Sequence, residues 1–314
     1  MDTNKVALIK GKSRKQNILR ALKLLGDDLL KDLKTKLDKK KNPYLLIKPN
    51  FVTTRRQLAA THVDAIRAVL DFLKDKYQGK IIIGEAASIG RTKEGFKNYG
   101  YFNLLREYKN IELVDLNTDE SVEIKGIGKK GKPIRLQISK LLAKAPYRIS
   151  VGPMKTHDRA IMTASIKNMA VGALQKGGFR PLNFASKLIL RRSFRDYKAA
   201  IHSAGYHELN RNIAKLYQYT KADLAVVDAY EAMERNGPVG GNSVEMQLAF
   251  ASLNPIATDT LAAHLMGFDE DRVGYLHMLG ANFKKVRVLG AKVENCQRKF
   301  RPHDSYVQQL DWEG

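Results

Sequence analysis

Two lysines, a histidine and an asparagine lie close together in this sequence, at positions with no evident packing role. Lys155 and His157 follow the strand-like run 148–151, and Lys167 and Asn168 come ten or more residues later. A lysine and a histidine at a strand end can bind an anion and transfer protons near neutral pH. We therefore predict that Lys155, His157 and Lys167 are catalytic. The alternative is that both lysines are solvated and that His157 caps a turn.

Polar residues also follow other strand-like runs of the chain. Lys48 and Asn50 come after 44–47, and Glu85 comes after 81–83. In open α/β sheets ligands bind beyond the carboxyl ends of the strands, so we expect these side chains to meet in one cleft. The residues predicted to bind the substrate are Lys48, Asn50, Glu85, Asn168, Asn236, Gly237, Gly240 and Gly241.

Acidic residues and a glycine-rich loop follow the strand-like run 224–227. Carboxylate oxygens can hold a divalent cation, and we predict Asp228 and Glu231 as its ligands. The Gly-Pro-x-Gly-Gly loop at 237–241 can direct backbone N–H groups toward an anion. The alternative is a helix-capping aspartate followed by an ordinary tight turn. Beyond this cation, the sequence leaves the cofactor unknown.

Basic residues strongly outnumber acidic ones. The chain has 55 lysines and arginines against 32 acidic residues, a formal net charge of +23 and a pI near 9.9. A pI of this size makes a nucleic-acid partner a reasonable hypothesis. Arg191, Arg192 and Arg195 lie among aromatic residues, a mixture that can contact phosphates and stack on bases. The alternative is a highly charged, solvated surface.

The apolar periodicity alternates between strand and helix along the whole chain. Strand-like runs recur at 6–9, 44–47, 80–83, 111–114, 147–151, 224–227, 244–251 and 285–289. The helical segments between many of them favour parallel pairing with right-handed crossovers. We predict a doubly wound α/β fold with a mainly parallel sheet, helices on both faces, a hairpin decoration near 120–137 and a helical insertion near 172–220. Residues 1–314 are expected to form a single α/β unit, or two lobes that divide near 145.

Cysteine usage and hydropathy bear on the compartment. The single cysteine, Cys296, excludes an intrachain disulfide and a cysteine-ligated iron–sulfur cluster. The first apolar run, 6–9, is too short for a signal-peptide core, and no window approaches the roughly 18 apolar residues of a membrane span. We therefore expect a cytoplasmic protein without a membrane partner. The sequence favours no particular oligomeric state.

Several short motifs together resemble one known family. They are Lys-Pro-Asn at 48–50, Pro-Met-Lys-Thr-His at 153–157, Ser-Ile-Lys-Asn at 165–168, Asn-Gly-Pro-x-Gly-Gly at 236–241 and Ala-Thr-Asp at 257–259. Over nearly the whole chain the set resembles the family catalogued as domain of unknown function 362, and more remotely the lactate racemase superfamily. The resemblance implies α/β lobes around one site, which in the racemases holds a hydroxy acid and a nickel pincer cofactor. The cofactor-lysine region of the racemases has no match here, so nickel is not implied. The ferredoxin-like cysteine motifs of many family members are missing, so electron transfer is not implied either.

Two classes of function remain. The first is an enzyme acting on a small anionic metabolite, a carboxylate or a phosphorylated compound, by lysine and histidine acid–base chemistry. The second is an RNA-binding protein that uses its basic surface. The position of the surplus cations separates them, because cations inside the cleft favour the enzyme and a basic stripe on the outside favours RNA.

Overall fold

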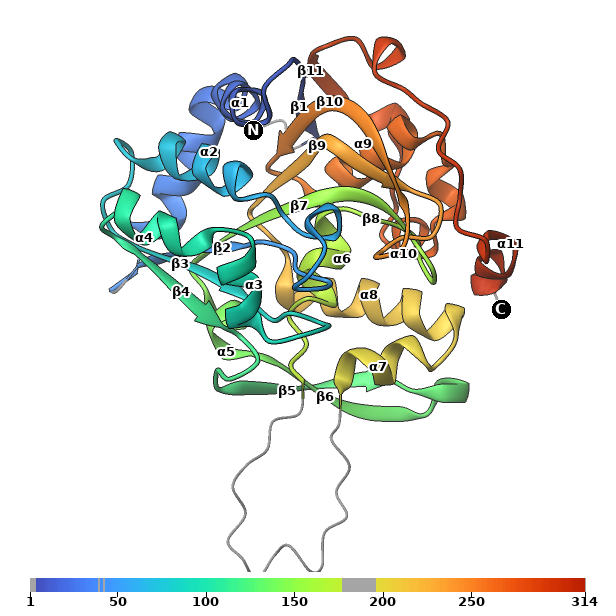
Figure 1. Ribbon diagram of the computed structural model, residues 1–314. Helices are drawn as coiled ribbons and strands as arrows, with labels where there is room; N and C mark the ends of the chain where they lie inside the picture. The colour runs from blue at the N-terminus through green and yellow to red at the C-terminus, as the bar shows by residue number, and fades with distance from the viewer. Residues whose placement is uncertain (1–3, 39, 42, 177–195, 314) are drawn as a thin grey trace, which may run out of the picture.

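The computed structural model describes residues 4–38, 40–41, 43–176 and 196–313, and one large sheet forms its centre (Figure 1). Its strands lie in the order β11-β1-β10-β9-β7-β2-β3-β4, and β8 pairs with β7. β5 and β6 form a separate two-stranded sheet. The strands are β1 (Lys5–Lys10), β2 (Tyr44–Lys48), β3 (Lys80–Glu85), β4 (Ile111–Asp115), β5 (Ser121–Ile127), β6 (Pro133–Ser139), β7 (Tyr147–His157), β8 (Ile161–Thr163), β9 (Leu224–Glu234), β10 (Asn242–Ser252) and β11 (Arg287–Gly290).

The large sheet is mainly parallel, as predicted. β2 pairs in parallel with β3 and β7, β3 with β4, and β7 with β9. Within the described part of this sheet, β8 and β10 are the strands that run against their neighbours. The carboxyl ends of β2, β3, β7 and β9 therefore lie at one edge, where an α/β sheet binds its ligands.

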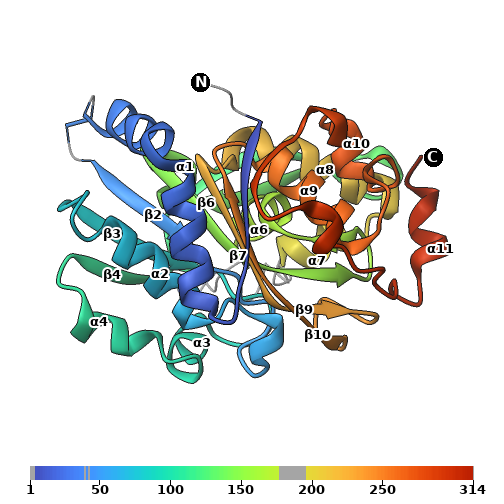
Figure 2. The same cartoon turned by 90° about the horizontal axis from the view of Figure 1, so that it is seen from above.

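Helices cover both faces of the sheet (Figures 1 and 2). Successive residues of β2 point to opposite faces: Leu45 joins one apolar core with α1 and α2, and Leu46 joins a second core with α6, α8 and α9. This two-sided burial confirms the predicted α/β class. The helices are α1 (Arg14–Leu37), α2 (Val63–Leu73), α3 (Thr92–Asn98), α4 (Leu104–Glu107), α5 (Lys140–Lys144), α6 (Ser165–Ala170), α7 (Tyr197–His202), α8 (Tyr206–Thr220), α9 (Pro255–Met266), α10 (Gly274–Met278) and α11 (Tyr306–Gln309).

Two strands run further than the sequence predicts. The expected ends are at 151 and 227, whereas β7 continues to His157 and β9 continues to Glu234. The polar end of β7 remains a strand because β8 folds back and pairs with it, and β10 pairs along most of β9. The helix that follows, α6, consequently begins only at Ser165.

The two predicted additions to the sheet differ in how much of them can be described. β5 and β6 pair in an antiparallel manner and confirm the hairpin. The insertion after 172 contains α7 and α8, but Arg191, Arg192 and Arg195 lie outside the described residues. No helix in the described ranges is both long and apolar enough to cross a membrane.

Candidate functional site

A cavity of about 450 Å³ opens at the carboxyl ends of the parallel strands. Its walls come from the segments after β2, β3 and β9, from the end of β7, and from α6 and α7. Seven of the residues predicted from the sequence line it: Asn50, Glu85, His157, Lys167, Asn236, Gly237 and Gly240.

Four other predicted residues, Lys48, Lys155, Asn168 and Gly241, do not line the cavity. Lys48 and Lys155 are fully buried, and both are bound to residues of the wall. The Lys48 ammonium donates to Glu85 Oε2 at 2.6 Å, and the Lys155 ammonium donates to Asn50 Oδ1 at 2.6 Å and to the Ala59 carbonyl at 2.9 Å. These two lysines therefore form a layer of positive charge behind the cavity surface.

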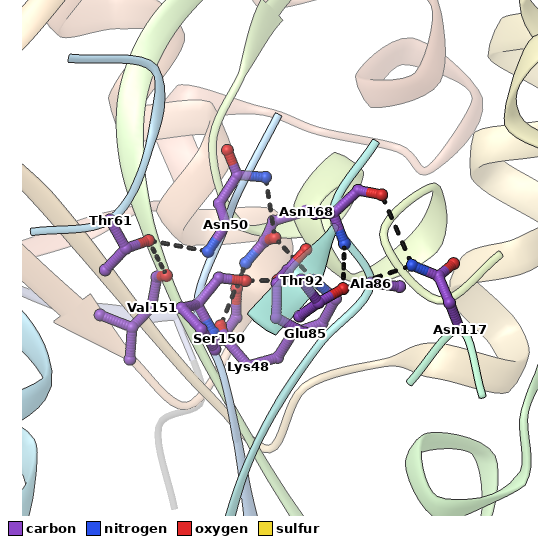
Figure 3. Close-up of polar contacts among 12 residues, drawn as sticks. Lys48, Asn50, Thr61, Glu85, Ala86, Thr92, Asn117, Ser150, Val151 and Asn168 are labelled. Atoms are coloured by element: carbon purple, nitrogen blue, oxygen red, sulfur yellow. Dashed lines mark hydrogen bonds and ion pairs between the residues drawn. The ribbon is translucent and has the colours of Figure 1, made fainter. Parts of the chain in front are cut away.

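Asn168 connects this layer to β2 and β7 (Figure 3). Its Oδ1 accepts from Asn50 Nδ2 at 3.1 Å and from Lys48 Nζ at 3.3 Å, while its Nδ2 donates to Ser150 Oγ at 3.1 Å. Thr61 Oγ1 holds the same region from the other side, because it accepts the Asn50 N–H at 2.8 Å. With these partners fixed, the orientation of the Asn50 amide is set before any ligand arrives.

Burial shifts the protonation of the lysines at this site. It lowers the pKa of Lys155 and of Lys198 to about 7 and that of Lys167 to about 8. The positive charge of Lys167 lowers the pKa of Lys155 further, whereas Glu85 opposes the shift. A buried ammonium is costly without a partner, which is the physical reason that all three amines release their protons near neutral pH.

The imidazole rings of His157 and His202 lie beside Lys167 on the cavity wall, and their centroids are 5.8 Å apart. Burial, with the neighbouring charge of Lys167, lowers the pKa of His157 to about 3 and that of His202 to about 4. Both rings are therefore neutral at pH 7. His157 Nδ1 lies 2.9 Å from Asp158 Oδ1 and 3.0 Å from the backbone nitrogen of Arg159, so its Nε2 is left for the cavity.

A buried carboxylate fixes α6, the short helix that carries Lys167 and Asn168. The two oxygens of Asp259 accept the N–H of Ser165 at 2.8 Å and the N–H of Ile166 at 3.0 Å. Burial raises the pKa of this carboxyl to about 7, against the stabilising effect of those two bonds. Asp259 thus ties α9 to the start of α6 and positions the residues that follow.

The rim of the cavity joins distant parts of the chain. The Arg56 guanidinium donates to the carbonyl of Val239 and, at 2.5 Å, to that of Gly241. A Cβ at Gly237 would lie 2.2 Å from the carbonyl oxygen of Thr156, so only glycine lets this loop approach β7 so closely. The glycines of the loop at 237–241 thus shape the rim.

Asp228 and Glu231, the predicted cation ligands, do not line the cavity. Arg14, at the start of α1, lies 2.9 Å from Asp228 Oδ2 and 3.9 Å from Glu231 Oε2, so a protein cation stands beside both carboxylates. No group of three or more histidine, cysteine, aspartate or glutamate side chains in the described ranges could hold a metal ion. In this structure Asp228 instead secures α1 to the sheet.

Sequence reasoning missed Lys198 and His202. Both line the cavity from α7, and the Lys198 ammonium donates to the carbonyl of Ala86. In the sequence, Lys198 lies three residues after Arg195, one of the arginines considered for nucleic-acid contact, whereas in the structure it is buried. Its spacing of four residues from His202 was the available signal, since such residues share one face of a helix.

Known proteins resemble this chain at several levels. Lactate racemase apoprotein from Thermoanaerobacterium thermosaccharolyticum aligns at 15% identity and a TM-score of 0.48, over 84% of this chain and 57% of that protein. A Thermotoga maritima protein of known crystal structure aligns at 11% identity and a TM-score of 0.43, over 76% of this chain and 56% of its own. This chain therefore spans little more than half the length of either protein.

The alignment with a curated relative covers more of that protein's length. The thylakoid-associated protein sll1697 of Synechocystis is 25% identical over 266 residues, which are 81% of this chain and 74% of that protein. A family model described as Domain of unknown function matches residues 45–264, a range that includes the ends of β2, β3, β7 and β9. The chain belongs to the DUF362 family.

Proposed function

We propose that the cavity binds a small anionic metabolite, a carboxylate or a phosphorylated compound, and that the protein is an enzyme acting on it. One observation carries this assignment. Among the described residues, four buried lysines line the cavity or stand directly behind it, whereas the one buried carboxylate on its wall is Glu85; Asp158 and Asp196, which also line it, are partly exposed. The four are Lys48, Lys155, Lys167 and Lys198.

The charge balance favours an anion as the missing partner. Lys48 is neutralised by Glu85, and the other three amines are left with neutral acceptors or with none. Buried charges in proteins are normally paired, and a phosphate or carboxylate in the cavity would supply the pairing. Ligand entry would thereby raise the lysine pKa values and couple anion binding to proton uptake.

The same groups could perform acid–base chemistry. His157 is a neutral imidazole whose Nδ1 contacts Asp158, an arrangement that leaves Nε2 able to exchange a proton with a ligand. Lys167 lies close enough to affect the pKa of His157, so an anion held by the lysine would also make the imidazole more basic. Lys167 and His157 together thus provide a proton donor and a proton acceptor.

Ligand content and ligand binding test this function. Native mass spectrometry of the purified full chain should show a bound small anion, or inorganic phosphate should raise the melting temperature by several degrees. Lys198→Gln should weaken phosphate binding at least tenfold, while Lys109→Gln, at an exposed lysine away from the cavity, should bind like the wild type. A chain that carries nothing and responds to neither phosphate nor pyruvate would contradict anion binding. Copurifying RNA, with a 260 nm absorbance that high salt removes, would favour the nucleic-acid alternative.

A further inference from the structure

The amine of Lys167 differs from the other buried amines of the site. Lys48, Lys155 and Lys198 each donate at least one hydrogen bond, to Glu85, to Asn50 or to a backbone carbonyl. Lys167 donates none to any residue that the structure describes. Its side chain is 7% exposed and lines the cavity, so the free amine faces the space where a ligand would bind.

A buried amine without an acceptor loses part of the stabilisation of its charged form. An ammonium in this position keeps its desolvation cost without a compensating hydrogen bond, so burial lowers the pKa of Lys167 to about 8, although the charge of Asp158 opposes the shift. With this pKa roughly a tenth of Lys167 carries a free lone pair at pH 7, and about half at pH 8. Desolvated lysines of this kind are nucleophiles toward carbonyl carbon.

Groups able to move protons lie next to this amine. Lys167, His157 and His202 line the same cavity, and the charge of Lys167 lowers the pKa of both imidazoles. Asp158 Oδ1, 2.9 Å from His157 Nδ1, can stabilise the imidazolium that forms when His157 accepts a proton. Attack by a lysine on a carbonyl needs such a relay, because one proton must leave the nitrogen and another must reach the departing oxygen.

Given the anion-binding function proposed above, on which this step depends, we infer that Lys167 forms an imine with a carbonyl compound that also carries an anionic group, such as a 2-oxo acid. Lys167 Nζ bonds to the carbonyl carbon as the C=O π bond opens; the nitrogen gives one proton to His157 Nε2 and the oxygen takes one proton from solvent, which gives a carbinolamine. The C–O bond then breaks, the His157 imidazolium gives its proton to the departing hydroxyl, and water leaves. The product is an iminium ion, and no oxidant or reductant is consumed.

The rest of the cavity suits the anionic end of such a substrate. Lys198 lines the same cavity and retains N–H groups beyond the one that it donates to Ala86. Lys155 adds positive charge from behind the wall. An iminium at Lys167 would remain cationic, so formation of the covalent bond would not remove a positive charge from the anion site.

Reductive trapping on the intact protein tests the inference directly. Glyoxylate, a small 2-oxo acid, and cyanoborohydride at pH 8 convert any imine into a stable carboxymethyl-lysine, which peptide mass spectrometry locates. We expect Lys167 to be labelled at least tenfold faster than the exposed Lys109, and inorganic phosphate to slow the labelling of Lys167 alone. Lys167→Arg should abolish the fast-labelled peptide and leave the label at Lys109 unchanged.

The outcomes separate this inference from the function on which it depends. Labelling of Lys167 at or below the rate of Lys109 would overturn the imine, whether or not phosphate binds. If phosphate still raises the melting temperature in that case, the anion site stands and only the covalent step is lost. Fast labelling that phosphate fails to slow would separate the reactive amine from the anion site and would overturn the inferred substrate class.

Discussion

Replacing Glu85 by glutamine should expose how strongly the buried lysines depend on this one carboxylate. Glu85 is 2% exposed and lies 2.6 Å from the ammonium of Lys48, and its charge also supports the protonation of Lys155 and Lys198. Breaking a buried ion pair by removing one partner costs roughly 3 to 5 kcal/mol. For 314 residues the unfolding entropy is about 0.7 kcal/mol per kelvin, so the melting temperature should fall by roughly 5 to 8 °C.

The chain offers a matched control for this variant. Glu112 lies the same 2.6 Å from its lysine, Lys80, but the two side chains are 52% and 57% exposed. Exposed pairs contribute about 1 kcal/mol or less, so Glu112→Gln should lower the melting temperature by no more than about 1.5 °C. Both variants can be compared by calorimetry in the same buffer without added phosphate.

Two results would refute the reasoning about Glu85. The first is a Glu85→Gln variant that melts within about 1.5 °C of the wild type, because the lysines would then need no compensating charge. The second is a Lys48→Met, Glu85→Gln double variant that is even less stable than Glu85→Gln, since removing the stranded cation should recover part of the loss. Added phosphate should stabilise Glu85→Gln more than the wild type.

Three further expectations follow from the site. Phosphate affinity, measured by calorimetry, should fall by up to about tenfold per pH unit above pH 8 as Lys167 deprotonates; a flat profile would contradict a role for this amine. Folding raises the pKa of Asp259 to about 7, so its contribution to stability is fully present at low pH and is lost as the pH rises through about 7. Urea denaturation between pH 5 and 8 should therefore show a shallower decline in the free energy of unfolding for Asp259→Asn than for the wild type. Gly237→Ala should cost about 1 to 3 kcal/mol because its Cβ would meet Thr156 at 2.2 Å, whereas Gly240→Ala, whose nearest contact is 3.1 Å, should cost clearly less in the same melts.

The sheet was predictable because its strands are short apolar runs in a regular rhythm. What the sequence could not show was where β7 ends, since Pro153 and Lys155 are unusual inside a strand, and their pairing depends on β8 and β9. The polar residues that follow the strand-like runs indicated one edge of the sheet, and Asn50 and His157, which line the cavity at that edge, were chosen in this way. The spacing of residues in the sequence does not show whether a side chain lines the cavity or lies behind its wall, because that depends on how the side chains pack.

Charge was the hardest property to interpret from sequence. Lys155 was predicted to face a ligand, yet it is fully buried and bonded to Asn50, so we now expect its truncation to destabilise the fold. Lys198 stands close to the arginines that were considered for nucleic-acid contact, although it is buried in the cavity wall. Asp228 looked like a metal ligand because Arg14, its ion-pair partner, is more than 200 residues away along the chain.

The position of β1 in the sheet has a consequence for biosynthesis. β1 lies between β10 and β11, so the first strand described pairs with two of the last, Ala7 opposite Ala251 and Val6 opposite Val288. At roughly 5 to 20 residues per second, a ribosome needs roughly 10 to 50 s to make the chain between β1 and β10. Throughout that interval an apolar strand has both edges unpaired, which is the state most prone to wrong pairing. A dependence on chaperones during synthesis would therefore arise from topology, even if the finished protein were very stable.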